Sequence, residues 1–391
     1  MKKICIITGS RAEYGLLSRV MRLIQEDADL QLQIIATNMH LSVEHGETYK
    51  EIEADGFVID KKIPILSLAD TANATAKSVG TGIIGFADAY EELQPDMIMV
   101  LGDRYEILAA VSAALFYKIP VIHLHGGEIT EGAYDDAIRH AITKMSHLHF
   151  TSTEEYRQRV IQMGEHPGTV YYVGALGCEN IRQIPLMDKE ELEKSINFAL
   201  NKNTILVTFH PVTMETNTAE TQFKELLSAI DKFDNLRVIF TLPNSDTDGR
   251  IIMDLIKEYV FDNSEKAVWF TSLGMKRYLS ALQYIGAVAG NSSSGIIEVP
   301  SFHIPTLNIG DRQKGRIAAA SVIHCNPERA DIAEKLAIIL QPGYAESLKN
   351  IQNPYDKPNT ACEIVRILKK QKIEPVKKFY NLNEWKILQN I

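Results

Sequence analysis

The chain has 391 residues and a formal net charge of −9, with 41 Lys and Arg residues against 50 Asp and Glu residues. This length exceeds one ordinary hydrophobic core and predicts two domains. The acidic balance argues against a nucleic-acid partner, which needs a basic surface. No apolar run spans a bilayer and no secretory signal is visible, so we expect a cytoplasmic protein without a membrane partner. The four scattered cysteines predict neither a disulfide framework nor a zinc site.

Short apolar runs recur along the first half of the chain, with helical patterns between them. They cover residues 3–8, 33–37, 97–101, 121–124, 148–151 and 170–173. Continuous apolar strands that alternate with helices are typical of a parallel sheet covered by helices on both faces. We therefore predict a doubly wound, Rossmann-like domain over residues 1–173.

The second half repeats this pattern after a helix predicted over residues 188–201. Its apolar runs cover residues 204–209, 236–241, 267–270, 284–289, 305–309 and 322–325. A second Rossmann-like domain is predicted over residues 174–370, with helix-compatible residues at 360–370. The boundary falls where Gly174 and Gly177 interrupt the pattern. The predicted fold class is thus α/β, with two doubly wound domains facing a cleft.

The last residues, 371–391, form a charged tail that carries three aromatic residues, Phe379, Tyr380 and Trp385. We expect this tail to pack back onto the first domain through those aromatic anchors. No internal repeat and no low-complexity linker is visible elsewhere in the chain.

The most informative stretch is the run Gly-Asn-Ser-Ser-Ser-Gly at residues 290–295, which follows a predicted strand. Small residues at a helix start, such as Ser292 and Ser293, offer backbone N–H groups and hydroxyls to a phosphate. Glu298, one turn on, can accept two hydroxyls, as from a ribose. A plain Asn-Ser turn is the alternative. A second strand–loop–helix start, over residues 4–11 and ending in Arg11, favours the phosphate interpretation.

Polar side chains also follow the strands of the first domain, where parallel sheets place their ligands. Asp103 and Arg104 follow the strand at 97–101. Asp103 suits acid–base chemistry or a plain helix cap, and the Arg104 guanidinium suits a phosphate.

The next strand is followed by His123, His125 and Glu128, with two glycines between His125 and Glu128 that allow the backbone to approach a ligand. His123 is interpreted as a core residue, whereas His125 and Glu128 suit acid–base or hydrogen-bonding roles. A metal site is less favoured, because no further ligand completes the set. Asp135 fits either a helix N-terminus or the same site.

In the second domain, His210 ends a strand and is expected to contact a phosphate or to shuttle a proton. Asn244 ends the following strand and is placed to touch a base or sugar. Arg312 lies in a glycine-flanked loop with three cations, at residues 310–316, which fits a phosphate or ribose better than a solvated charge run.

Together these residues predict a nucleotide-diphosphate binder with a carboxylate and histidine cluster opposite the phosphate. Two enzyme classes fit: one that breaks the sugar–diphosphate bond without an acceptor, and a glycosyltransferase. A nucleotide-sugar sensor is the non-enzymatic alternative, although a sensor has little need for so many titratable groups.

The sequence resembles the hydrolysing UDP-N-acetylglucosamine 2-epimerases of bacterial sialic acid synthesis. The matching stretches are residues 9–15, 101–106, 123–128, 138–144, 290–300 and 308–315. The resemblance implies a two-Rossmann-domain, glycosyltransferase-B-like architecture, no nicotinamide or other cofactor, no catalytic metal, and a homodimer. It also implies the reaction of UDP-N-acetylglucosamine with water to give UDP and N-acetylmannosamine.

By the same resemblance, UDP is held by Arg11, Arg104, His210, Asn244, Ser292, Ser293, Glu298 and Arg312, with Glu298 on the ribose and the serines on the distal phosphate. The resemblance implies acid–base work for Asp103 and for the region from Glu128 to Asp135. The residues themselves add His125 and His210 as catalytic candidates. The related animal bifunctional enzyme has Glu where this chain has His125, and its Asp matches Asp135 only across a one-residue insertion. A diamino-sugar substrate, as in legionaminic acid synthesis, therefore stays open.

Overall fold

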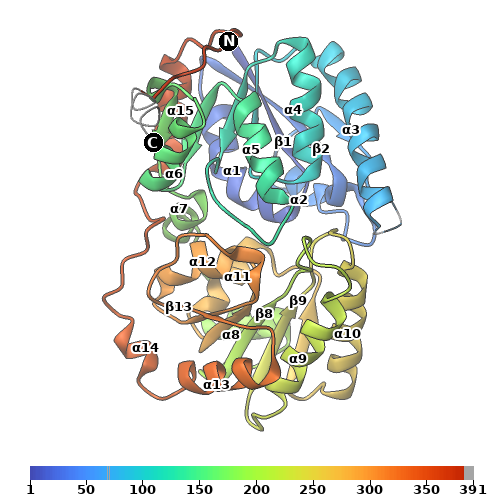
Figure 1. Ribbon diagram of the computed structural model, residues 1–391, viewed down its shortest axis with the longest axis vertical. Coiled ribbons are helices and arrows are strands. Elements are labelled where there is room, and N and C mark those ends of the chain that lie inside the picture. Colours follow the sequence, from blue (N-terminus) through green and yellow to red (C-terminus); the bar gives the residue numbers. More distant parts are fainter. Residues whose placement is uncertain (68, 70, 383–391) are drawn as a thin grey trace, which may run out of the picture.

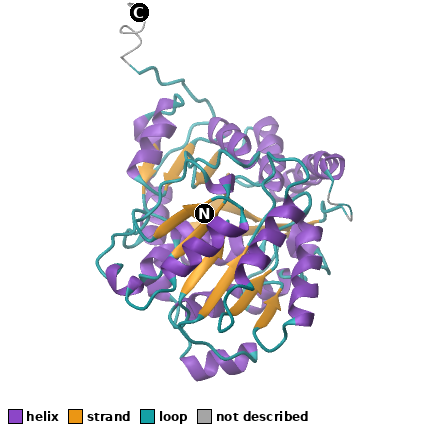
Figure 2. Cartoon of the chain, turned by 60° about the horizontal axis from the view of Figure 1, so that its bottom comes forward, coloured by secondary structure: helices purple, strands orange, loops and turns teal. Residues whose placement is uncertain are grey.

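The computed structural model describes residues 1–67, 69 and 71–382. The described chain forms two parallel α/β units, one above the other in Figure 1. In each unit the strands lie between layers of helices (Figure 2), because their apolar runs are buried on both faces of the sheet.

The first sheet has seven parallel strands in the order β3-β2-β1-β4-β5-β6-β7. The strands are β1 (Lys2–Thr8), β2 (Leu30–Thr37), β3 (Lys61–Ile63), β4 (Met97–Leu101), β5 (Val121–Leu124), β6 (Leu148–Thr151) and β7 (Val170–Tyr172). The sequence did not predict β3, because two of its three residues are lysines and no apolar run marks it.

The helices of the first unit cover both faces of this sheet. They are α1 (Arg11–Gln25), η1 (Asn38–Leu41), α2 (Tyr49–Ala54), α3 (Ala72–Leu93), α4 (Tyr105–Tyr117), α5 (Asp135–Met145), α6 (Glu154–Gln162) and η2 (Pro167–Thr169). A capping box starts α1: Ser10 accepts from the Glu13 backbone N–H, and the Glu13 carboxylate accepts from that of Ser10.

The second sheet has six parallel strands in the order β10-β9-β8-β11-β12-β13. The strands are β8 (Thr204–Thr208), β9 (Arg237–Thr241), β10 (Ala267–Phe270), β11 (Ala287–Gly290), β12 (Thr306–Ile309) and β13 (Val322–Cys325). The predicted fold class, two doubly wound α/β units, is confirmed. The strand predicted over residues 284–289 begins three residues later, because Tyr284 and Ile285 still donate backbone hydrogen bonds into the turn after a helix.

The helices of this part are α7 (Leu176–Gln183), α8 (Lys189–Ile196), α9 (Ala219–Ile230), α10 (Gly249–Asp262), α11 (Gly274–Leu282), α12 (Ser294–Ile297), η3 (Val299–Phe302), η4 (Asp311–Gln313), α13 (Arg329–Ile339) and α14 (Tyr344–Ser347). The helix predicted over residues 188–201 is α8. It ends at Ile196 because Asn197 takes the left-handed conformation, with φ 49°.

The last helix, α15 (Thr360–Lys370), returns to the first unit (Figure 1). Its buried residues Ile364 and Leu368 share one hydrophobic core with Leu17 and Ile24 of α1. The sequence groups residues 360–370 with the second domain, but the apolar face of α15 completes the first core. The chain therefore passes between the units twice, once between β7 and α7 and once between α14 and α15.

The described part of the tail, residues 371–382, also lies on the first unit. The Tyr380 backbone N–H donates to the Gly164 carbonyl at 2.9 Å, and Lys377 pairs with Glu165 at 2.7 Å. The Phe379 ring lies against Gly164. Trp385, the third expected anchor, lies outside the described residues. Within the described ranges, no helix combines the length and apolarity needed to cross a membrane.

Candidate active site

A cavity of about 340 Å³ lies between the carboxyl ends of the two sheets. Both units contribute to its wall, as the strand-end rule for parallel sheets requires. All the residues predicted for the site line it: Arg11, Asp103, Arg104, His125, Glu128, Asp135, His210, Asn244, Ser292, Ser293, Glu298 and Arg312. The structure thus brings these residues together, while their individual roles stay predictions.

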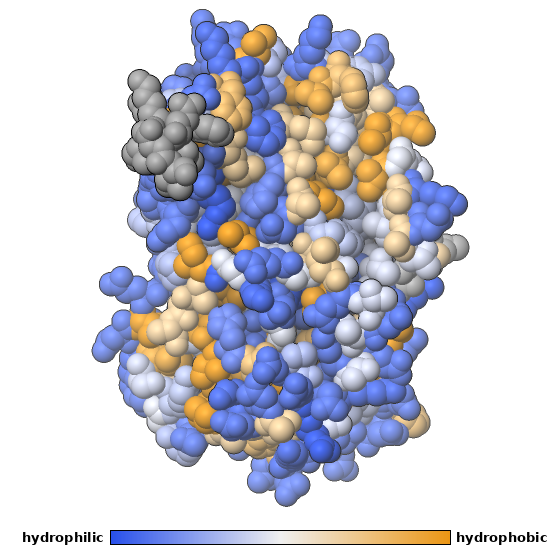
Figure 3. All heavy atoms as spheres, in the orientation of Figure 1, coloured by the Kyte–Doolittle hydropathy of each residue, from blue (hydrophilic) through white to orange (hydrophobic). Residues whose placement is uncertain are grey.

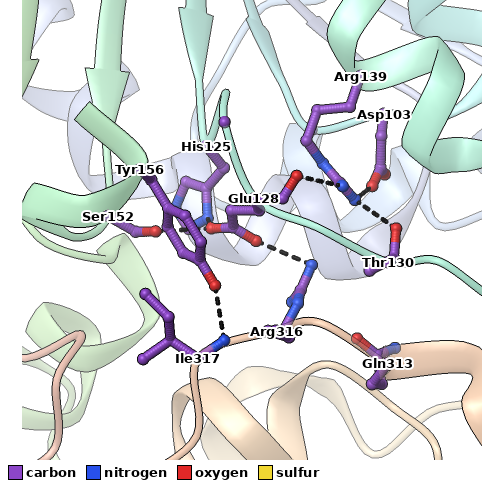
Figure 4. Close-up of polar contacts among 12 residues, drawn as sticks. Asp103, His125, Glu128, Thr130, Arg139, Ser152, Tyr156, Gln313, Arg316 and Ile317 are labelled. Atoms are coloured by element: carbon purple, nitrogen blue, oxygen red, sulfur yellow. Dashed lines mark hydrogen bonds and ion pairs between the residues drawn. The ribbon is translucent and has the colours of Figure 1, made fainter. Parts of the chain in front are cut away.

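One side of the cavity holds a chain of polar contacts centred on Glu128 (Figure 4). The Glu128 Oε1 atom lies 2.9 Å from His125 Nδ1 and accepts from the Ser152 hydroxyl at 2.7 Å. Its Oε2 atom lies 2.8 Å from Arg316 Nη2, which comes from the second unit. Burial raises the pKa of Glu128, but Arg316 and His125 outweigh burial and hold it at about 2. Glu128 is therefore ionised at neutral pH.

This ionised partner fixes the tautomer of His125. A carboxylate only accepts hydrogen bonds, so His125 Nδ1 must be the donor, and the lone pair of the neutral ring resides on Nε2. Nε2 is buried and has no hydrogen-bond partner in the part of the chain that the structure describes. The backbone of His125 is left-handed, with φ 65°, which turns the residue away from the line of β5. His125 Nε2 is therefore able to accept a proton.

Asp103 at the end of β4 is held by a buried arginine that the sequence analysis did not single out. Arg139 on α5 donates to an Asp103 carboxylate oxygen, to the Glu128 carbonyl at 2.9 Å and to the Thr130 hydroxyl at 3.1 Å (Figure 4). His123, interpreted as a core residue, is fully buried and contacts the Gly102 carbonyl at 2.8 Å.

Asp135, the first residue of α5, is buried and lies near a second carboxylate, Asp246, from the other unit. Burial, followed by repulsion from Asp246, raises the pKa of Asp135 to about 6. The Oδ2 atom of Asp135 has no hydrogen-bond partner within the described ranges. Asp135 can therefore gain and lose a proton near neutral pH.

Asp246 joins cations from both units. Its Oδ1 atom lies 3.2 Å from Arg104 Nη1, and its Oδ2 atom lies 3.7 Å from Arg312 Nη2. Arg104 also contacts Glu106 at 2.8 Å and the Ser245 hydroxyl at 3.1 Å. Burial raises the pKa of Asp246, but Arg104 and Arg312 more than offset it and lower the pKa. Two of the three arginines predicted to hold UDP are thus already fixed on the cavity wall.

His210, at the end of β8, is held in one orientation. The Asn291 side chain accepts from the His210 backbone N–H at 2.7 Å and donates to its carbonyl at 2.8 Å. The ring Nδ1 accepts from the Asn244 backbone N–H at 3.2 Å, so the proton of the neutral ring resides on Nε2. Burial lowers the pKa of His210 to about 3. This histidine is equipped to donate a hydrogen bond and poorly suited to shuttle a proton.

The loop between β11 and α12 needs its first glycine. Gly290 has φ 126°, and a side chain there would collide with the Thr208 carbonyl. Ser292 and Ser293 follow, half-buried on the cavity wall. Glu298 comes after α12 and packs against Gly177 of α7, where a Cβ would collide with its carboxylate. Burial raises the pKa of Glu298 to about 7.

Arg11, the remaining cation expected to bind UDP, starts α1 and also reaches the other unit. Its Nε atom lies 2.8 Å from a Glu51 carboxylate oxygen, and its Nη1 atom donates to the Ser272 carbonyl at 3.1 Å. The described residues contain no group of three or more His, Cys, Asp or Glu side chains that could hold a metal ion.

Sequence reasoning did not single out three charged residues of this site: Arg139 and Arg316, which line the cavity, and Asp246, which contacts two of its arginines. All three lie in or near stretches that the sequence analysis discussed. Arg139 lies four residues after Asp135, Asp246 lies two residues after Asn244, and Arg316 ends the cation-rich loop at residues 310–316. Position relative to a strand end was therefore an available signal. The partners were not available, because the contacts of Asp246 with Arg104 and of Arg316 with Glu128 form only across the two units.

Known proteins are similar to this chain in sequence and in architecture. The chain is 46% identical to a Campylobacter jejuni protein named GDP/UDP-N,N'-diacetylbacillosamine 2-epimerase (hydrolyzing), over 86% of this chain and 87% of that protein. It is 42% identical to the Escherichia coli polysialic acid biosynthesis protein P7, over 98% of each. A Neisseria meningitidis UDP-GlcNAc 2-epimerase, solved with UDP-GlcNAc bound, superposes with a TM-score of 0.78 at 20% identity, over 95% of this chain and 100% of that one.

The fold with its interdomain cavity is glycosyltransferase-B-like, and together with these relatives it defines a nucleotide-sugar 2-epimerase of the hydrolysing type. The sequence profile of the family described as UDP-N-acetylglucosamine 2-epimerase matches residues 22–369, and the chain belongs to this family.

Proposed function

We propose that the protein hydrolyses a UDP-linked 2-acetamido sugar with inversion at C2, and that the sugar carries a second acetamido group at C4. The substrate would be UDP-N,N'-diacetylbacillosamine, which the most informative observation supports: the 46% identity to a hydrolysing epimerase of that name. UDP-N-acetylglucosamine, giving N-acetylmannosamine, is the second candidate. The family description and the resemblance at the site residues favour it.

The chemistry makes use of the charges around the cavity. In an α-linked substrate, the C1–O bond and the C2–H bond are axial and antiparallel. A base takes the C2 proton, the C1–O electron pair leaves with UDP, and a 2-acetamidoglucal remains. Arg312, the two serines and the His210 N–H are suited to stabilise charge on the departing diphosphate, by about 3 kcal/mol for each well-placed donor. Water then adds its oxygen to C1 while a proton returns to the opposite face of C2.

These reaction steps need two groups that exchange protons near neutral pH. Asp135 meets this requirement because its pKa is about 6, and His125 is the second candidate because it presents an unpartnered Nε2. Glu128 does not, since it is paired with Arg316 and ionised. We therefore assign proton transfer to His125 and Asp135 and orientation to Glu128. Asp103 is assigned a contact with the substrate.

The test follows both nucleotide sugars, and a GDP-linked control, by proton NMR in heavy water with EDTA present. We expect free C2-inverted sugar with deuterium at C2, and a higher kcat/KM for the diacetamido substrate. Retained C2 hydrogen would contradict elimination. A UDP-linked epimer would indicate a non-hydrolysing enzyme, and no change without an acceptor would indicate a transferase or sensor. A higher kcat/KM for UDP-N-acetylglucosamine would select the second candidate.

A further inference from the structure

We infer that Arg316 is a positioning residue that acts through Glu128 on His125, so that the second unit orients the imidazole of the first. This inference rests on the proposed function, in which His125 transfers a proton. Arg316 would then link closure of the two units to the chemistry, although the residue that reacts lies entirely in the first unit.

The contacts form one continuous chain across the two units (Figure 4). Arg316 Nη2 lies 2.8 Å from one Glu128 oxygen, and His125 Nδ1 lies 2.9 Å from the other. The side chains of Arg316 and Glu128 are 5% and 3% exposed. A buried guanidinium–carboxylate pair fixes both partners, because either group alone would be left as an uncompensated charge.

Backbone contacts on both sides of Arg316 hold it in place. The Glu131 N–H donates to the Lys314 carbonyl at 3.0 Å, and the Ile317 N–H donates to the Tyr156 hydroxyl at 2.9 Å. Gly315, with φ 83°, packs so closely on Ile129 that a Cβ there would strike that side chain. Separation of the units would therefore withdraw the Arg316 guanidinium from Glu128.

Loss of Arg316 would change the protonation of Glu128 and hence the tautomer of His125. Burial raises the pKa of Glu128, and Arg316 is the largest of the effects that oppose it. Without Arg316 the carboxyl takes up a proton at higher pH. A neutral carboxyl can donate as well as accept, so it no longer requires the proton of the ring on Nδ1. Other ionisable groups around the contacts of Arg316, Glu128 and His125 are His123, Arg139, Tyr156, Glu298 and Tyr355.

Arg316 also lines the cavity, so a direct contact with substrate is the rival explanation. A double-mutant cycle with Arg316→Gln and Glu128→Gln separates the two. We expect Arg316→Gln to lower kcat about 10–100-fold, the scale of effect that follows loss of a partner that orients a metal-bound histidine, with little change in KM. In the Glu128→Gln background it should change kcat less than about 2-fold. Losses that multiply would mean that Arg316 acts directly on the substrate.

The pH profile of kcat gives a second readout. In Arg316→Gln the loss of kcat should become smaller as pH rises, because Glu128 ionises again. The loss of kcat in Glu128→Gln should show no such recovery. Any contribution from titration of Glu298 would persist in the double variant. Arg316→Lys keeps the charge and should keep the wild-type profile. Arg366→Gln removes an exposed arginine on α15 that pairs with Glu363, and serves as the matched control. A defect in Arg316→Gln that does not vary with pH would overturn the inference.

Nitrogen NMR of ¹⁵N-histidine-labelled protein tests the relay without turnover, with His125→Asn to assign the signals. We expect the neutral His125 ring to carry its proton on Nδ1 in the wild type and on Nε2 to a large extent in Arg316→Gln. The same tautomer in both proteins would refute the relay. Absence of activity toward every nucleotide sugar would refute the proposed function alone, since the NMR result would still stand. If Arg316→Gln fails to fold, Arg316→Met provides the same comparison, because it also removes the charge and keeps much of the side-chain volume.

Discussion

Four titratable residues of the cavity, Glu128, Asp135, His210 and Glu298, are all buried, yet their neighbours give them different protonation states. Glu128 is paired with Arg316 and has its pKa held at about 2, whereas Asp135 faces a second carboxylate and has its pKa raised to about 6. Burial brings the pKa of His210 to about 3 and that of Glu298 to about 7. Residue type alone therefore does not assign acid, base and hydrogen-bond donor, because the partners decide which groups titrate near neutral pH.

Asp135 gives a prediction about pH. Its ionised form becomes the main form only above its raised pKa of about 6, so kcat should fall on the acid side of that value if Asp135 acts first as a base. Asp246→Asn removes the second-largest cause of the raised pKa, so this acid limb should move to lower pH. The measurement is kcat against pH. Asp248→Asn, two residues along the same loop, is the control, and an acid limb shared by all three proteins would contradict the assignment.

His125→Asn is expected to lower turnover by about 10²–10⁴, the usual contribution of a general acid or base. Asparagine is chosen because it tolerates the left-handed backbone at this position, where φ is 65°. UDP affinity by calorimetry should stay near the wild-type value. His166→Asn, at an exposed loop position, controls for the substitution itself. Full turnover by a folded His125→Asn would remove His125 from the mechanism.

At the scale of elements, sequence periodicity predicted the strands well, but it did not predict which sheet the last helix covers. Five of the strands, including β4 and β5, have the predicted bounds, because a buried strand in a parallel sheet is apolar along its whole length. Periodicity also found the helix at residues 360–370. It could not say which sheet this helix covers, because the apolar face of α15 fits either core by composition and only the path of the chain decides.

A large-to-small substitution in α15 tests its placement. Leu368 is fully buried in the first core, so Leu368→Ala should cost about 2–5 kcal/mol of unfolding free energy. Hydrogen exchange should show the loss of protection in β1 and β2. Leu336→Ala in α13, equally buried in the second core, should instead affect β12 and β13, which α13 contacts. Loss of protection in the second sheet after Leu368→Ala would contradict the packing of α15.

The contact between α7 and Glu298 gives a second prediction at this scale. Gly177→Ala places a methyl group against the Glu298 carboxylate, so we expect weaker UDP binding and a loss of about 1–3 kcal/mol from overpacking. Gly80→Ala in α3 is the matched control, because its Cβ would contact nothing within 4 Å. That change should stabilise the protein by about 0.5–1 kcal/mol through helix propensity. Unchanged UDP affinity in Gly177→Ala would argue against a ribose contact by Glu298.

At the scale of the whole molecule, apolar side chains are exposed along α3 and α4 of the first unit. Ile84, Leu115 and Phe116 are 68%, 52% and 79% exposed, and Figure 3 shows orange residues on the upper half of the molecule, where Figure 1 places these helices. An exposed apolar surface of this kind is typical of an interface between subunits. It supports the homodimer that the family resemblance implies.

If the expected homodimer forms through this surface, Phe116→Asp should shift the protein from dimer to monomer, because a charge would be buried in the interface. Light scattering coupled to size-exclusion chromatography measures the mass directly. Phe261→Asp removes a phenylalanine that is 85% exposed on α10 of the second unit, and it should leave the mass unchanged. A dimer that persists in Phe116→Asp would place the interface elsewhere.

The two passages of the chain between the units are tied together. The Ala175 N–H donates to the Tyr355 carbonyl at 3.0 Å, and the Thr360 hydroxyl donates to the Val173 carbonyl at 2.8 Å. Two linked connections resist twisting better than one, so we expect the units to rotate mainly about an axis that runs through this pair of connections. The far rim, where Arg250 of α10 meets Glu44 at 3.0 Å, would then move furthest. Tyr156 and Ile317 contact each other and Tyr355 close to the connections, so we expect products to leave across the far rim.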